Sequence, residues 1–395
     1  MFIYQCDNCG KTYERDSVRY LCPVCSKEFI PGNPLKGVLK VIFDYVNIKN
    51  DFDVIHPNWN LFSAVEEKYY PEYPVGNTSF FQTKKLDGNV WIKNDGLNPS
   101  GSLKDRASFL VVAEANRLGI DTIVTASTGN AASALAAVCA ASNKKAIIFV
   151  PASAPKAKLV QMILYGAKVI LVKGSYDDAF KLSLEYTDKF EGLNRNTAYN
   201  PLTIEGKKTV GLEIFAQNNF KAPDIVFIPV GDGVIISGVY KAFYDLKMSG
   251  LIEKLPKLIC VQAENSSAIH NFIVSGKYKN LESSKTIADS ISVSAPSNAF
   301  MAKNVVIESD GFSVTVSDEE IMDAQKNLAN KTGIFAEPAA SATYAGYLKS
   351  KEKINSNEQV VLLITGHGLK DIEAPLAGIK IPEAIITNIN NVKIS

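Results

Sequence analysis

The amino-acid sequence predicts an α/β fold with one or two mostly parallel sheets, and three observations lead to this class. Short apolar segments rich in Val and Ile recur without in/out alternation, which is typical of parallel strands buried on both faces. Segments with helical periodicity lie between them, such as AASALAAVCAAS and PKAKLVQMILYG. Glycine-rich or hydroxyl-rich loops follow several of the apolar segments, as they do in strand–turn–helix units.

Six apolar segments are the expected strands: TIVTAS, AIIFVP, KVILVK, DIVFIPV, LICVQA and VVLLIT. The chain has 395 residues, of which 46% are hydrophobic and 21% are charged. This balance is typical of a globular protein with a large core and two or three domains. The polar, aromatic-bearing segment 41–81 has no clean period, so we expect it to wrap around the main body.

Charge and hydropathy argue against two classes of partner. The formal net charge is only +1, so nothing in the composition indicates binding to nucleic acid or to an anionic membrane. No apolar run approaches the roughly 20 residues that span a bilayer. The first residues, MFIYQCDNCGK, contain no signal-peptide hydrophobic region. We therefore expect a cytoplasmic protein without a membrane partner.

Four of the six cysteines form two C-x-x-C pairs, Cys6 with Cys9 and Cys22 with Cys25. Two such turns can complete a tetrahedral zinc site, and four thiolate ligands leave no open position for catalysis. The alternatives are two disulfides or a ribbon that has lost its metal, and disulfides are rare without an export signal. The sequence predicts a structural zinc site. Cys139 and Cys260 lie in apolar runs and are expected in the core.

Four loops of the type that binds ligands are expected at strand ends or helix starts. They are NPSGSLKDRAS at 98–108, STGNA at 127–131, GDGVIISG at 231–238 and TGHGLKD at 365–371. In open α/β sheets, ligands bind outside the carboxyl ends of the strands, where such loops meet. One such loop is weak support for a site, but four together are strong support.

The loops do not match the common nucleotide, metal or hydrolase motifs. The sequence contains no G-x-x-x-x-G-K-[ST], no complete G-x-G-x-x-G after a strand, no H-E-x-x-H and no G-x-S-x-G. What remains is a lysine used covalently, Lys104, together with a glycine loop for a phosphate. This combination indicates a Schiff base between Lys104 and pyridoxal 5'-phosphate.

The motifs NPSGSLKDRAS, ASTGNAASALAA, NPLTIEGKKT, GIFAEPAASA and TGHGLKD resemble those of the threonine synthase family. This family belongs to the fold-type II pyridoxal-phosphate enzymes, with threonine dehydratase and cysteine synthase. The resemblance covers nearly the whole chain. It implies two three-layer α/β domains with mostly parallel sheets, a cofactor cleft between them, and a small N-terminal ribbon that carries the four cysteines. It also implies a homodimer.

The resemblance divides the chain into three parts. We expect a zinc-ribbon-like module at 1–30, a large cofactor-binding domain at 31–110 and 200–395, and a small substrate-side domain at 111–199.

The resemblance also assigns roles to individual residues. Lys104 would form the Schiff base and then act as acid and base, Asn130 would hydrogen-bond the cofactor's phenolic oxygen, and Thr365 would lie beside its pyridine nitrogen. The cofactor phosphate would lie against Gly231, Asp232, Gly233, Val234 and Ile235. The substrate would contact Ser102, Ser127, Thr128, Gly129, Ala131, Thr203 and Lys207.

Each of these residues also has a plainer interpretation. Lys104 could be a solvated helix residue or part of a structural ion pair, and Asn130 could cap the following helix. Thr365 could be an ordinary turn residue, and Glu337 could be a loop carboxylate with its hydrogen bonds satisfied.

Two departures from the family pattern bear on the substrate. Thr203 occupies the position of the family's phosphate-binding arginine, and threonine cannot form a bidentate, charge-assisted contact with phosphate. Lys207 or Lys208 could supply the missing charge. Asp232 places a carboxylate in the phosphate loop, which requires that it point away or accept local N–H groups.

We therefore expect a pyridoxal-phosphate-dependent lyase that acts on a phosphoamino acid. The first interpretation is threonine synthase, which converts O-phospho-L-homoserine and water to L-threonine and phosphate. A cysteate synthase-like replacement on O-phospho-L-serine with sulfite and a threonine/serine dehydratase are the alternatives. A nucleic-acid-binding zinc ribbon is the non-enzyme alternative, but acidic residues offset the basic ones between Cys9 and Cys22 and aromatic residues are few there.

Overall fold

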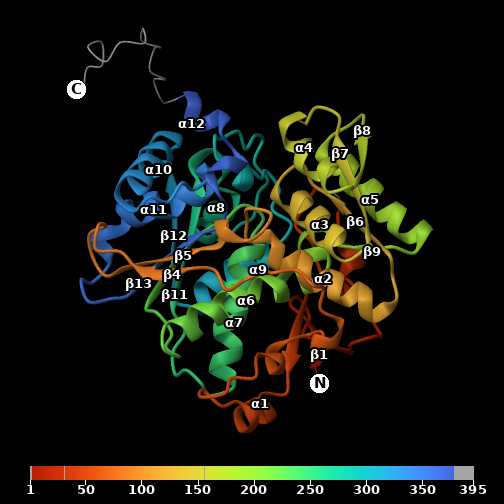
Figure 1. Cartoon of the computed structure of the whole chain (residues 1–395), viewed down its shortest axis with the longest axis horizontal. Coiled ribbons are helices and arrows are strands. Elements are labelled where there is room, and N and C mark those ends of the chain that lie inside the picture. Colours follow the sequence, from red (N-terminus) through yellow and green to blue (C-terminus); the bar gives the residue numbers. More distant parts are fainter. Residues whose placement is uncertain (1, 31, 155, 378–395) are drawn as a thin grey trace, which may run out of the picture.

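The computed structural model describes residues 2–30, 32–154 and 156–377 as an α/β fold with three sheets (Figure 1). The strands are β1 Phe2–Cys6, β2 Thr12–Glu14, β3 Leu39–Phe43, β4 Phe80–Gln82, β5 Val90–Asn94, β6 Thr122–Ala126, β7 Lys145–Pro151, β8 Lys168–Val172, β9 Leu193–Asn194, β10 Ile225–Pro229, β11 Lys257–Ala263, β12 Ser313–Val316 and β13 Val360–Ile364. The helices are α1 Tyr45–Asp51, α2 Lys104–Leu118, α3 Asn130–Ala141, α4 Lys156–Leu164, α5 Tyr176–Phe190, α6 Leu202–Gln217, α7 Val234–Met248, α8 Ala268–Ser275, α9 Ala299–Glu308, α10 Asp318–Thr332, α11 Pro338–Ser350 and α12 Glu373–Ala377.

The largest sheet has six strands in the order β12-β11-β10-β13-β5-β4. All neighbours are parallel except β4, which pairs antiparallel with β5 at the edge. Helices α10 and α11 cover one face of this sheet, and α6, α7 and α9 lie on the other (Figure 1). The carboxyl ends of β10 and β13, which are neighbours in the sheet, therefore open at the same edge.

Successive residues of the central strands enter different cores. Val226 and Ile228 of β10 pack in the core shared with α6 and α7, whereas Ile225 and Phe227 pack in the core beneath α11. Every residue of β10 and β13 is buried. This burial on both faces explains why these strands are continuously apolar in the sequence.

The second sheet is fully parallel, with strand order β8-β7-β6-β9. Helices α2 and α3 pack on one face and α5 packs on the other. In Figure 1 this sheet lies at the upper right, beside the six-stranded sheet. Helix α2 contacts both α6, beside the large sheet, and α3, beside the small one, so it joins the two layered bodies.

The N-terminal residues form a third, antiparallel sheet with the order β2-β1-β3. The module is tied to the body at a specific point, because the Tyr20 hydroxyl accepts a hydrogen bond from the backbone N–H of Asn194 at 2.9 Å. The Tyr20 ring also stacks on Tyr199, with 4.6 Å between the ring centroids. The module therefore contacts the segment between β9 and α6.

The six expected strands are confirmed as β6, β7, β8, β10, β11 and β13. The six expected strands did not include β12, whose residues SVTV are half polar, the two-residue strand β9, or β1 to β5 in the first part of the chain. Segment 41–81 contains α1 and two 3-10 turns, and its aromatic side chains pack on the main core. Cys139 and Cys260 are buried, as expected.

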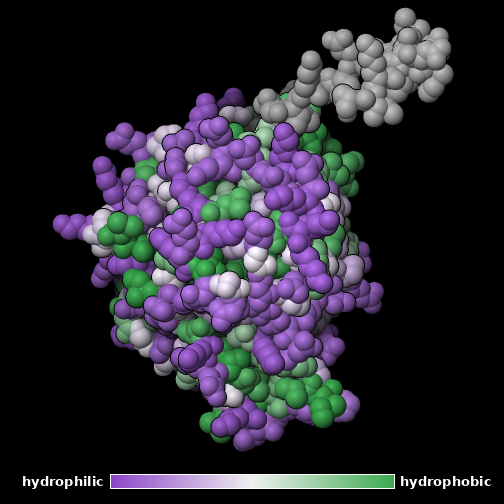
Figure 2. Space-filling view, turned by 90° about the vertical axis from the view of Figure 1, so that its left-hand side faces the viewer, coloured by the Kyte–Doolittle hydropathy of each residue, from purple (hydrophilic) through white to green (hydrophobic). Residues whose placement is uncertain are grey.

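The surface gives no sign of a membrane-spanning segment. Within the described residues, none of the helices is both long enough and apolar enough to cross a bilayer. The face shown in Figure 2 is mostly hydrophilic, and its hydrophobic residues form small separate groups.

A buried ion-pair network fixes α2 against the large sheet. Arg106 donates to both carboxylate oxygens of Asp95, with Nε–Oδ2 at 2.6 Å and Nη2–Oδ1 at 2.9 Å, and its Nη1 donates to Glu213 at 2.7 Å. Asp95 follows β5, and Glu213 lies on α6. Asp95 and Arg106 are almost completely buried and little exposed to water, so each charge is stabilised mainly by the other.

Replacing Arg106 with methionine should lower the free energy of unfolding by about 3–5 kcal/mol, because it leaves the buried Asp95 carboxylate without a counter-charge. The measurement is urea-induced unfolding at neutral pH. Lys351→Met, which breaks an exposed pair with Asp87, is the matched control and should leave the free energy of unfolding nearly unchanged. Equal losses in the two variants would contradict the structural role of Arg106.

The contribution of Glu213 should depend on pH. Burial alone would raise its pKa, but Arg106 and Lys93 lower the pKa of Glu213 to about 2. A lowered carboxyl pKa stabilises the fold above the unfolded value near 4.3, and this stabilisation disappears as pH falls toward 2. The stability difference between the parent and Glu213→Gln, measured by urea unfolding, should therefore be largest near pH 7 and shrink below about pH 4. A difference that is constant over this range would contradict the assignment.

Candidate functional site

A cavity lies where loops from the expected strand ends come together. Its lining residues are Lys104, Ala131, Arg195, Thr197, Lys207, Pro229, Val230, Gly231, Asp232, Gly233, Val234, Ile235, Ser290, Ile291, Val293, Ala339 and Thr365. The lining combines the first turn of α2, the start of α3, the turn between β10 and α7, and the residue after β13. All four predicted loops thus contribute lining residues, and three of them do so through one residue each: Lys104, Ala131 and Thr365.

Lys104 is the first residue of α2, and backbone contacts hold this helix start beside the end of β13. The Leu103 N–H donates to the Thr365 carbonyl at 2.9 Å, and Ser102 forms an isolated bridge with Gly366. Burial lowers the pKa of Lys104, while the Glu337 carboxylate opposes this shift. A lysine with a lowered pKa has more neutral amine at physiological pH, which is the nucleophilic and basic form.

Helices α3 and α7 begin at the cavity without a side-chain cap, whereas the first N–H of α2, that of Lys104, donates to the Ser102 hydroxyl at 3.4 Å. Helices α2, α3 and α7 begin after Leu103, Gly129 and Gly233, and none of these residues makes a side-chain cap hydrogen bond. By contrast, Ser175 and Ser317 form capping boxes at α5 and α10. Uncapped helix starts leave N–H groups free and carry partial positive charge, so they favour anionic groups.

The turn before α7 requires glycine at two positions. Gly233 has φ +88°, and a Cβ there would lie 2.8 Å from Cβ of Ala302. A Cβ on Gly231 would lie 2.9 Å from Cα of Ile291. The backbone can therefore form this tight turn into the helix only without side chains at these two residues.

Asn130 is buried, and its amide is hydrogen-bonded in this structure. Its Nδ2 donates to the Glu337 carboxylate at 2.9 Å and 3.2 Å and to the Ser290 hydroxyl at 3.2 Å. Burial raises the pKa of Glu337, and the hydrogen bond from Asn130 opposes this shift. Glu337 is thus hydrogen-bonded at the cavity edge, close enough to act electrostatically on Lys104.

Asp232 does not leave a free carboxylate in the phosphate loop. One of its oxygens accepts from the Ser297 N–H at 2.5 Å, and the other accepts from the Ser297 hydroxyl at 2.7 Å. Burial raises the pKa of Asp232, and these two hydrogen bonds oppose the shift. The local N–H contact that the sequence required of this residue is present.

Lys207 and Arg195 add two further basic groups to the cavity. Burial, together with repulsion from Arg195 and Lys104, holds the pKa of Lys207 well below its usual range. Burial lowers the pKa of Arg195 to about 10. Neither residue forms an ion pair with a carboxylate of the described part of the chain.

The remaining predicted contacts do not line this cavity. Ser102, Ser127, Thr128 and Gly129 lie in the two adjoining loops. Thr203 is fully buried, and its hydroxyl contacts the backbone carbonyls of Thr197 and Asn200. The Thr203 side chain is therefore engaged within its own turn.

Sequence reasoning missed Arg195, Thr197 and Ser290. Arg195 follows the two-residue strand β9. The only indication of a functional role in the sequence is its position as a basic residue between two asparagines. Thr197 and Ser290 lie in irregular segments and carry no periodic or motif signal.

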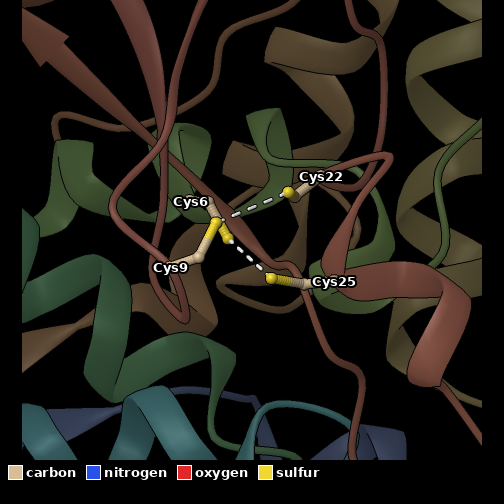
Figure 3. A group of neighbouring side chains, drawn as sticks. All are labelled: Cys6, Cys9, Cys22 and Cys25. Carbon is tan, nitrogen blue, oxygen red and sulfur yellow. Dashed lines mark hydrogen bonds between the residues drawn. The ribbon is translucent and has the colours of Figure 1, made fainter.

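The four N-terminal cysteines form a second candidate site, shown in Figure 3. Their sulfur atoms all lie within 4.8 Å of one another, with 3.8 Å between Cys6 and Cys25 and 3.9 Å between Cys9 and Cys22. Four thiolates bound to one zinc at about 2.3 Å would have sulfur atoms about 3.8 Å apart, so this cluster can hold a tetrahedral metal. The Tyr13 hydroxyl lies 3.0 Å from Sγ of Cys22.

The cavity also fits the cofactor expected from the sequence. An uncapped helix start with two obligatory glycines suits a phosphate, and Lys104 supplies an amine with a lowered pKa. The buried Thr365 hydroxyl lies on the cavity wall without adding a charge.

Comparisons with known proteins support the same cofactor. A family model described as "Pyridoxal-phosphate dependent enzyme" matches residues 72–366. Threonine synthase from Methanocaldococcus jannaschii is 36% identical over 416 residues, covering 99% of this chain and 98% of that protein. Threonine synthase from Methanosarcina acetivorans is 35% identical, covering 100% of this chain and 98% of that protein.

Solved structures share the fold at lower identity. Threonine deaminase isoform 2 from Solanum lycopersicum superposes with a TM-score of 0.66 at 22% identity, covering 88% of this chain and 92% of its own. O-ureido-L-serine synthase gives a TM-score of 0.66 at 20% identity, covering 78% of this chain and 95% of its own. These similarities to solved structures show the α/β fold. The family match and the two relatives aligned over nearly their full length show that the chain belongs to the threonine synthase family of pyridoxal-phosphate-dependent enzymes.

Proposed function

We propose that this protein is a threonine synthase, which converts O-phospho-L-homoserine and water to L-threonine and phosphate. The observation that carries the proposal is the match to threonine synthases over at least 98% of both chains, which includes the N-terminal cysteines and the Lys104 loop. These relatives do not favour the cysteate synthase-like, dehydratase or nucleic-acid-binding alternatives.

Pyridoxal phosphate, when bound, supplies an electron sink that makes the hydrogen on the substrate α-carbon acidic. Lys104 is the residue that would take and return protons, because it is the cavity lysine at the start of α2 and burial lowers its pKa. The Thr365 hydroxyl is a neutral partner for a ring nitrogen, and Asn130 supplies an amide donor.

The uncapped helix starts supply the anion sites. The first turn of α7, after Gly231 and Gly233, would bind the cofactor phosphate through its backbone N–H groups. The start of α3, with Ser127, Thr128, Gly129 and Ala131 around it, would bind the substrate carboxylate. Ser102, which forms a bridge with Gly366, would contact the substrate from the Lys104 loop.

We infer that the cysteine cluster binds zinc and that the metal is structural. The sulfur spacing suits tetrahedral coordination, and all four ligand positions are taken by protein. The same proposal includes the division of the chain into an N-terminal module at 1–30, a large domain at 31–110 and 200–395, and a small domain at 111–199. It also includes assembly as a homodimer. Residues 378–395 of the proposed large domain lie outside the described part of the chain.

The test of the function is product formation by the purified holoenzyme. We expect release of phosphate from O-phospho-L-homoserine with equimolar L-threonine, identified by chromatography. O-phospho-L-serine with sulfite is the comparison, and cysteate as the main product would overturn the proposal. Release of 2-oxobutanoate from threonine as the main reaction would indicate a dehydratase instead.

Lys104→Ala is the matched variant for this assay. It should lose the visible absorption of the lysine-bound cofactor, and kcat should fall by at least about 1000-fold, because the covalent anchor and the proton-transfer group are the same amine. Lys208→Met is unsuitable as a control, since Lys208 is buried in ion pairs with Glu205 and Asp245. Lys351→Met is the control, because it changes a surface lysine outside the cavity, and it should retain both the absorption and the activity. An unchanged visible spectrum in Lys104→Ala would refute the role of Lys104.

Replacing Cys6 and Cys9 together with serine should remove zinc, from about one atom per chain to almost none, because two of four ligands are lost. The unfolding temperature should fall, while the visible cofactor absorption should remain. Metal content is measured by atomic emission after desalting. Cys139→Ala, a buried cysteine in α3, is the control and should keep its zinc. Equal metal content in the parent and the double variant would refute the site.

A further inference from the structure

Arg195 is a buried cation whose hydrogen-bonding capacity is not satisfied. Its side chain is 1% exposed, and its Nε donates to the Ser108 hydroxyl at 3.2 Å. Its Nη2 is buried without a hydrogen-bond partner among the described residues. An unpaired, buried guanidinium is costly to the fold unless a ligand arrives to pair with it.

Hydrogen bonds hold both the segment that carries Arg195 and its guanidinium. On one side, Asn196 accepts hydrogen bonds from the Ala126 N–H at 2.7 Å and the Thr125 hydroxyl at 3.0 Å, which ties the segment to β6. On the other side, Ser108 lies one helical turn after Lys104, so Arg195 packs against the face of α2 that carries Lys104. Arg195 is therefore preorganised in the same cavity as Lys104.

The basic residues of the cavity can accommodate two anionic groups. Three basic residues line it, Lys104, Lys207 and Arg195, and the carboxylate oxygens of Asp232 are occupied by Ser297. The start of α7 is sufficient for the cofactor phosphate, because its N–H groups are uncapped. Arg195 and Lys207 are then left for a second anion that enters and leaves with each turnover.

We propose that Arg195, with Lys207 beside it, binds the phosphate group of the amino-acid substrate. This inference rests on the proposed function. The planar guanidinium offers Nη2 and its neighbouring N–H groups for a charge-assisted contact with phosphate oxygens. Thr203 is not available for this task, since its hydroxyl is bound to carbonyls of its own turn. Arg195 therefore contributes to substrate selection, because a site built for phosphate strongly disfavours a substrate that lacks it.

The test uses holoenzyme with Arg195→Gln, Arg195→Lys and Arg195→Met, and Arg19→Gln at an exposed arginine as the control. KM for O-phospho-L-homoserine should rise about 10- to 100-fold in Arg195→Gln and less in Arg195→Lys, as expected for loss of charge-assisted hydrogen bonds. The visible cofactor absorption should stay unchanged. A KM within twofold of the parent, or loss of cofactor from all three variants, would overturn the proposal.

A second readout does not depend on activity. Inorganic phosphate should raise the unfolding temperature of the parent holoenzyme by binding the native state, and Arg195→Met should lose this effect. Without phosphate, Arg195→Met should unfold at the same or a higher temperature, because an unpaired buried charge has been removed. Retained phosphate stabilisation in Arg195→Met would overturn the proposal. If the parent forms no threonine but its phosphate stabilisation depends on Arg195, the anion site stands and the proposed function fails.

Discussion

The buried pair between Asp95 and Arg106 is the interaction on which the site depends. Arg106 lies two residues after Lys104, and Asp95 follows the strand that pairs with β13. The bidentate contact thus fixes the first turn of α2 against the sheet edge where Thr365 lies. Because both groups are almost fully buried, any shift of α2 would separate two charges in a medium of low dielectric constant. A small displacement of α2 is therefore unfavourable, and Lys104 at its start is held in a fixed position.

Around this fixed point, the cavity concentrates positive potential that the fold itself does not neutralise. Lys104, Lys207 and Arg195 face it, and helices α3 and α7 begin there without side-chain caps. Elsewhere the same chain caps its helices with serine, as at Ser175 and Ser317. Mutual repulsion and burial lower the pKa of Lys207, and burial lowers that of Arg195, so the ligand-free state is electrostatically unfavourable. Binding of the cofactor phosphate and the substrate phosphate would relieve this repulsion, so part of the protein's stability would depend on its ligands.

The sequence was sufficient for the parts of the molecule that are governed by periodicity or by short motifs. Five of the six apolar strands follow from burial on both sheet faces, whereas β8 is only partly buried at the edge of its sheet. The start of α2 at Lys104 follows from the strand–turn–helix pattern. Arg195 could not be predicted in this way, because its importance arises from the absence of a partner, and only coordinates show which atoms a guanidinium fails to reach among the described residues. The orientation of the Thr203 side chain could not be predicted either. Its hydroxyl donates to the carbonyl of Asn200, and the spacing of residues in the sequence does not distinguish this rotamer from one that faces a ligand.

The N-terminal module contacts one short segment, 194–199, that contributes Arg195 to the cavity. Tyr20 accepts a hydrogen bond from the Asn194 N–H and stacks on Tyr199, so the module contacts both ends of the stretch that carries Arg195. The strand of this stretch, β9, has only two residues and can supply little order on its own. The zinc proposed for the four cysteines would make the module a rigid support for this segment, because four ligands would fix its two C-x-x-C turns. The proposed zinc would thereby influence how the cavity holds a substrate anion, although its four thiolate ligands leave no position open for catalysis.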